Sequence, residues 1–106
     1  MNDLVSRLTE GPQRVIVGGP SPTAEEFGKR VTEIGYAFIK FPDTRGGTDL
    51  GVKVDQTATR LNHADFDSGE GRVHVEGTLT LDFVDVRCVA DIDLATLSGT
   101  GQLVRA

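Results

Sequence analysis

The feature that most constrains the fold is the alternation of apolar and polar residues from Arg72 to Leu94, RVHVEGTLTLDFVDVRCVADIDL. Apolar side chains occupy odd positions up to Phe83 and even positions from Val84 onward. Because side chains alternate between the two faces of a strand, this pattern predicts antiparallel sheet with one buried face and one face in water. Any fold for this chain has to account for the single change of phase.

Two geometries produce such a change: a bulge inside one long strand, or a hairpin centred between Phe83 and Val84. A single strand over the whole stretch would be roughly 75 Å long, whereas a domain of this size has a radius of gyration of about 13 Å. We therefore predict a hairpin. The segment lacks the Gly or Asn of two-residue loops, which favours a four-residue loop over Asp82 to Asp85. The expected pairs on its apolar face are Leu81–Val86, Leu79–Cys88 and Gly77–Ala90.

The strongest helix signal lies between Pro22 and Ile34, directly after a cluster of Gly, Pro and Ser. Four apolar residues recur there at helical spacing and predict one buried stripe: Ala24, Phe27, Val31 and Ile34. Either Ser21 or Thr23 can cap the start of the helix, and Gly35 is placed to end it. A short amphipathic helix of this kind needs an apolar surface on which to pack.

Shorter patterns predict the remaining elements. Segment 2–9 is expected to form a short helix or a docked arm, and segments 14–17, 36–41 and 50–54 are expected to be strands. Segment 42–47 has the Pro, Asp and Gly of a turn or exposed loop. The segments Ser68–Gly71 and Ser98–Gly101 are each predicted to be a glycine turn that leads into the next strand.

Length, charge and hydropathy exclude several classes of protein. The 106 residues provide one core, so we expect a single domain over 1–106. The net charge is −5 and the Lys and Arg residues are not clustered, which argues against nucleic-acid binding. No apolar run approaches the roughly 20 residues of a membrane span, and the N-terminus lacks the apolar segment of a signal peptide. We therefore expect no membrane association and a cytoplasmic location.

Three other features have plain structural interpretations. Cys88, the only cysteine, stands in the apolar phase of the alternation and is predicted to be a small buried hydrophobe. The segment Asp65–Gly71 looks superficially like a calcium loop, but Gly69 stands where a ligand is required, so we expect an acidic turn. Gly18–Ser21 lacks the lysine and the glycine spacing of phosphate-binding loops and is expected to be a tight connection. We expect no metal site and no cofactor.

The candidate catalytic residues are His63, His74 and Tyr36. If Ser68–Gly71 turns a hairpin, His74 lies opposite a residue near Asp65 or His63, and a histidine pair with a carboxylate could do acid–base work. The alternation, however, places His74 on the face in water, where nothing excludes solvent from a reaction. Surface histidines are therefore the preferred interpretation.

The candidate partner-binding residues form an acidic row on the outer face of the predicted hairpin, and most such rows are solvated faces that keep sheets from aggregating. A basic partner is the alternative, although two arginines in the same region would partly neutralise the row. The row consists of Asp82, Asp85, Asp91 and Asp93.

These observations predict an α+β fold: an antiparallel meander of four to six strands with one amphipathic helix packed on its apolar face. The alternative is a small closed or partly closed β-barrel with a plugging helix. The function expected first is that of a non-catalytic accessory or protein-interaction domain, acting through its sheet surface or as a homodimer. The alternative is a barrel that binds a small hydrophobic ligand, including a cofactor-free isomerase or cyclase. The sequence does not decide whether the chain is an enzyme.

Overall fold

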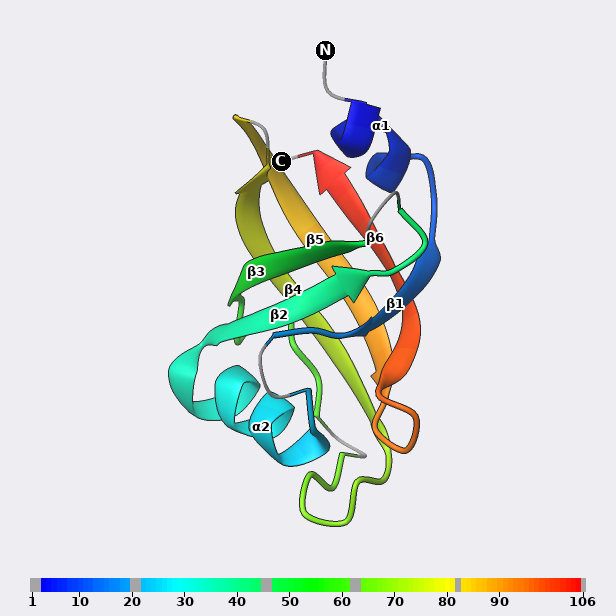
Figure 1. Ribbon diagram of the computed structural model, residues 1–106. Helices are drawn as coiled ribbons and strands as arrows, with labels where there is room; N and C mark the ends of the chain where they lie inside the picture. The colour runs from blue at the N-terminus through cyan, green and yellow to red at the C-terminus, as the bar shows by residue number, and fades with distance from the viewer. Residues whose placement is uncertain (1–2, 20–21, 45–46, 62–63, 82, 106) are drawn as a thin grey trace.

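The computed structural model describes residues 3–19, 22–44, 47–61, 64–81 and 83–105. Within these ranges, antiparallel strands follow one another around a closed barrel in chain order, and the last strand pairs with the first (Figure 1). The strands are β1 (Gln13–Val17), β2 (Tyr36–Phe41), β3 (Thr48–Val54), β4 (Arg72–Leu81), β5 (Val84–Asp93) and β6 (Ser98–Arg105). The predicted antiparallel meander is confirmed, and so is the alternative that closes it into a barrel.

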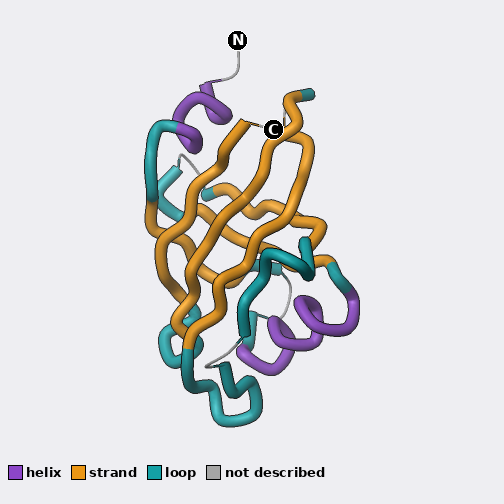
Figure 2. The backbone as a smooth tube through the Cα atoms, turned by 180° about the vertical axis from the view of Figure 1, so that it is seen from behind, coloured by secondary structure: helices purple, strands orange, loops and turns teal. Residues whose placement is uncertain are grey.

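The barrel is flattened into two layers. The long strands β4, β5 and β6 lie side by side, and β2 and β3 cross in front of them in Figure 1 and behind them in Figure 2. Inward-facing side chains from both layers fill the space between them, as the alternation predicts. Examples that are at most 1% exposed are Val15, Ile39, Phe41, Val52, Val73, Val75, Val86, Cys88 and Leu103.

Helices cover the two ends of the barrel. The first, α1 (Asp3–Thr9), lies beside the end of β6 and buries Val5 and Leu8 completely (Figure 1). The second, α2 (Ala24–Lys29), continues as the π-helical turn η1 (Arg30–Ile34) and contributes Phe27 and Val31 to the core. Both helices therefore complete the core at places where the strands alone would leave it open to water.

The predicted second helix is correct at its ends and wrong in one position of its stripe. Thr23 caps it by accepting a hydrogen bond from the Glu26 amide at 3.1 Å, and Gly35 ends it with a φ of 76°. Ile34, predicted to be buried, is 52% exposed. The Gly35 amide bonds to the Arg30 carbonyl five residues earlier, and this wider turn rotates Ile34 out of the apolar stripe.

The hairpin of β4 and β5 is confirmed, but its predicted register is wrong by two residues. The observed pairs are Leu81–Val84, Leu79–Val86, Gly77–Cys88 and Val75–Ala90. The loop therefore contains two residues rather than four, and Phe83 takes the left-handed conformation usual for Gly or Asn, with a φ of 67°. Asp82 lies outside the described residues. A shift of two keeps every side chain on its predicted face.

The predicted glycine turn at Ser98–Gly101 is also wrong, because these residues begin β6. The chain turns just before them, over residues 94–97, where the Leu97 amide donates a hydrogen bond to the Asp93 carbonyl at 2.7 Å. Gly99 is required for close packing instead: a Cβ atom there would overlap the Asp91 carbonyl of the neighbouring strand.

Candidate binding groove between β3 and β4

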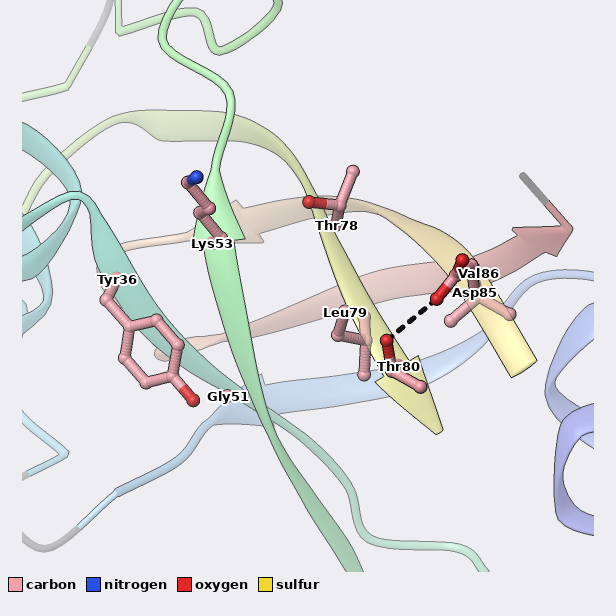
Figure 3. Close-up of a pocket in the computed structure, with 8 residues that line it drawn as sticks. All are labelled: Tyr36, Gly51, Lys53, Thr78, Leu79, Thr80, Asp85 and Val86. Carbon is pink, nitrogen blue, oxygen red and sulfur yellow. Dashed lines mark hydrogen bonds between the residues drawn. The ribbon is translucent and has the colours of Figure 1, made fainter. Parts of the chain in front are cut away.

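Like β1 and β2, which pair at Ile16–Lys40 and Val17–Ile39, the strands β3 and β4 pair over only a short stretch of the barrel. These strands pair only at Lys53–Thr78 and Val54–Gly77, whereas β4 pairs with β5 along its whole length. Beyond Thr78 the two strands diverge (Figure 3). In the described part of the chain, residues 48–52 of β3 and 79–81 of β4 have no strand partner on the sides that face each other.

A groove of about 630 Å³ lies over this divergence. Its floor is apolar and includes Leu79, whose side chain points between the two strands (Figure 3). Its rim carries hydroxyl groups and two side chains of opposite charge. The residues that line this β3–β4 groove are Tyr36, Gly51, Lys53, Thr78, Leu79, Thr80, Asp85 and Val86.

Tyr36 forms one wall of the β3–β4 groove because β3 has a glycine beside it. A Cβ atom at Gly51 would overlap the Tyr36 hydroxyl group, so the absence of a side chain there makes room for the ring. The Tyr36 ring also contacts the Phe38 ring edge-to-face, with ring centroids 5.6 Å apart and planes at 87°. The Arg30 guanidinium stacks on Phe38 at 5.0 Å from its centroid.

The charged residues of the groove stand on opposite walls (Figure 3). Lys53 projects from β3 and is exposed. Asp85 projects from β5 and accepts a hydrogen bond from the Thr80 hydroxyl at 2.8 Å. The groove therefore offers a cation on one side, a carboxylate on the other and an apolar floor between them.

His74 lies outside this groove, on the outer face of β4. Its Nδ1 is 2.8 Å from an Asp91 carboxylate oxygen and its Nε2 is 2.6 Å from a Glu76 oxygen. A neutral imidazole has one N–H, so two carboxylates at its two nitrogens favour the doubly protonated cation. The hydrogen bond to Glu76, followed by that to Asp91, raises the pKa of His74 although partial burial opposes the charge.

Arg87 extends these contacts into one network. Its Nε donates to Glu76 at 3.1 Å and its Nη2 to Asp55 at 2.8 Å. Hydrogen bonds from Thr57 and then from Arg87 lower the pKa of Asp55 to about 2. Each ionised group of this network already has a partner, as expected of a structural surface network.

The structure places the two described catalytic candidates apart from each other. Tyr36 is in the groove, His74 is in the network on the outer face, and His63 lies outside the described residues. His74 was expected opposite a residue near Asp65 or His63, and the residue that it pairs with is Arg60. The reason is that Asp65 pairs with Glu70 across a tight local turn, which leaves the preceding residues to reach β4.

The acidic row is divided in the same way. Asp85 lies in the groove, Asp91 binds His74, and Asp93 accepts a hydrogen bond from the Ala95 amide at 2.9 Å. Asp82 lies outside the described residues. Of the described members of the row, only Asp85 faces the groove.

The remaining sequence features are structural. Asp65 accepts hydrogen bonds from the Asp67 and Ser68 amides at 3.1 and 3.2 Å, as in an acidic turn. The Gly19 amide, which an anion would need, donates to an Asp49 carboxylate oxygen at 2.9 Å. Cys88 is 1% exposed, and burial raises the pKa of its thiol to about 12.

Sequence reasoning missed the groove, although Tyr36 and Asp85 among its lining residues had been named as candidate functional residues. The signal available was Gly51 at an outward position of an otherwise regular strand, where a missing side chain indicates a close neighbour. No helix within the described ranges is long and apolar enough to cross a membrane. No family model and no curated protein matches this sequence.

Proposed function

We propose that this chain is a non-catalytic protein-interaction domain and that its binding surface is the β3–β4 groove. The observation that supports the proposal is the divergence of the two strands, which leaves two short backbone edges facing each other across a groove. Unpaired strand edges are templates for an added strand.

The groove has the features by which added strands are recognised. Backbone amides and carbonyls at an edge supply affinity, while alternate side chains of the guest strand enter pockets that supply specificity. Here one set of guest side chains would contact the apolar floor formed by Leu79 and Val86. The other set would lie near Lys53 and Asp85, which favours a guest segment that carries both charges.

The arrangement of polar groups supports binding rather than catalysis. General acid–base catalysis needs the reacting groups within hydrogen-bond reach of one bound substrate. Tyr36 lines the groove, whereas both nitrogens of His74 are engaged by carboxylates on another face. The described groove therefore holds one of the candidate catalytic side chains without the other.

The test is site-specific photocrosslinking in the native cell. A photoreactive phenylalanine analogue replaces Thr80 in the groove or, as the matched control, Gln102 on β6. We expect crosslinks to one protein segment from position 80 and none to that segment from position 102. A synthetic peptide of the captured segment should then compete for binding. Equal capture from both positions, or no capture from position 80, would contradict the proposal.

The size of the groove supports one alternative, the binding of a small hydrophobic ligand. Ligand sites have volumes of roughly 300–1,000 Å³, and this groove has about 630 Å³. The ligand would bind in the groove beside Tyr36, since core side chains fill the barrel interior. Native mass spectrometry of protein purified from its own cell distinguishes the two proposals, because a retained small molecule would favour the ligand.

A further inference from the structure

Phe83 is exposed in a way that folding does not explain. It stands at the tip of the β4–β5 hairpin, is fully exposed, and holds a left-handed φ of 67°. Leu97 is the other described non-glycine residue with a positive φ, and its side chain packs against the core. Burial therefore offsets the strain at Leu97, whereas Phe83 has strain and exposure together.

The exposed ring and the β3–β4 groove belong to the same hairpin. Phe83 follows the free β4 edge at residues 79–81 by two positions, and Thr80 and Asp85 of the hairpin line the groove. Two copies related by a two-fold axis can therefore pair their β4 edges antiparallel to each other. That pairing carries each Phe83 over the groove of the other copy, where Leu79 and Val86 form an apolar floor.

Under the same two-fold axis, the charged residues of the groove in one copy complement those of the other copy. A hairpin that enters the groove brings its own Asp85 toward the wall that carries Lys53. The reciprocal contact forms at the same time, because an isologous interface contains each contact twice.

We infer that the occupant of the groove is a second copy of this chain, held by reciprocal insertion of Phe83, pairing of the β4 edges and two Lys53–Asp85 ion pairs. This inference rests on the proposed function and names its partner. A dimer of this kind covers the free edge of β4 and the exposed aromatic ring together.

The test is sedimentation equilibrium of the full chain over a wide range of concentration. Wild type should approach twice the monomer mass as concentration rises. Phe83→Asn should weaken association at least tenfold, while Val104→Asn, which changes another exposed hydrophobe on the outer face of β6, should not. Circular dichroism confirms that each variant is folded.

Charge reversal gives a second test that does not depend on Phe83. Lys53→Glu and Asp85→Lys should each weaken self-association, since both contacts of each homodimer become repulsive. An equimolar mixture of the two variants should associate as wild type does, because both contacts of the mixed dimer are then attractive. Failure of the mixture to associate would overturn the assigned interface.

The outcomes also separate this inference from the proposed function. A folded chain that remains monomeric at every concentration, while position 80 crosslinks a different protein, overturns the second copy and leaves the interaction domain supported. A monomeric chain with no crosslink from position 80 contradicts both.

Discussion

Replacing Phe83 with Asn should make the isolated monomer more stable. Phe83 holds a φ of 67°, a region that costs an L-residue roughly 1–2 kcal/mol and that Asn tolerates better. The side chain is fully exposed, so its removal forfeits no burial within the monomer. The expected gain in the free energy of unfolding is about 1 kcal/mol, equivalent to a rise in Tm of roughly 4–8 °C.

The assay is urea unfolding followed by circular dichroism, at concentrations below self-association so that only the monomer is compared. Leu97→Asn is the matched control, since Leu97 has a φ of 55° and a side chain packed on the core. It relieves similar strain but loses roughly 2 kcal/mol of apolar burial, so it should lower stability. A folded Phe83→Asn variant that is no more stable than wild type would show that the backbone at Phe83 is not strained.

Three further predictions concern the barrel itself. Gly99→Ala should destabilise the fold by about 3 kcal/mol, because its Cβ would overlap the Asp91 carbonyl, whereas Gly11→Ala, with open space around it, should stay within about 0.5 kcal/mol in the same unfolding assay. Because folding raises the pKa of His74, its protonated side chain should stabilise the fold below about pH 6.5, and this stability should be lost as pH rises through the raised pKa. The difference in free energy of unfolding between wild type and His74→Gln should therefore shrink from pH 5.5 to 9, and a difference that grows with pH would contradict this. Cys88, with a pKa of about 12 and almost no exposure, should react with iodoacetamide at pH 8 roughly 10³-fold more slowly in the folded than in the unfolded protein; equal rates would show that the thiol is accessible.

The fold could be predicted largely from sequence because alternation fixes which side chains face inward. The inner rows of β4 and β5, including Cys88, lie where the pattern places them. The register of β4 against β5 was harder to predict, because it depends on the length of the connecting loop. In that loop Phe83 adopts a left-handed conformation that a phenylalanine in the sequence does not predict. Likewise the wide turn before Gly35, which exposes Ile34, has no marker in helical periodicity.

The candidate site was harder to predict than the fold. It arises where two strands separate, and separation depends on how far pairing extends between residues distant in the sequence. Lys53 and Thr78 are paired while Gly51 and Thr80 are not, although the local sequence is equally regular at both. Glycines illustrate the same limit: Gly99 was expected to turn the chain, but it allows a close approach of two strands.

The divergence of β3 and β4 can be measured by hydrogen exchange of the amides in residues 79–81 that face β3. If β3 and β4 diverge as described, these amides should exchange fast in dilute protein and become at least tenfold slower as the concentration, and with it self-association, increases. Strong protection already in the dilute monomer would show that β3 pairs along all of β4, and the groove would not exist. Fast exchange at every concentration, in a chain that nevertheless associates, would show that association uses another surface.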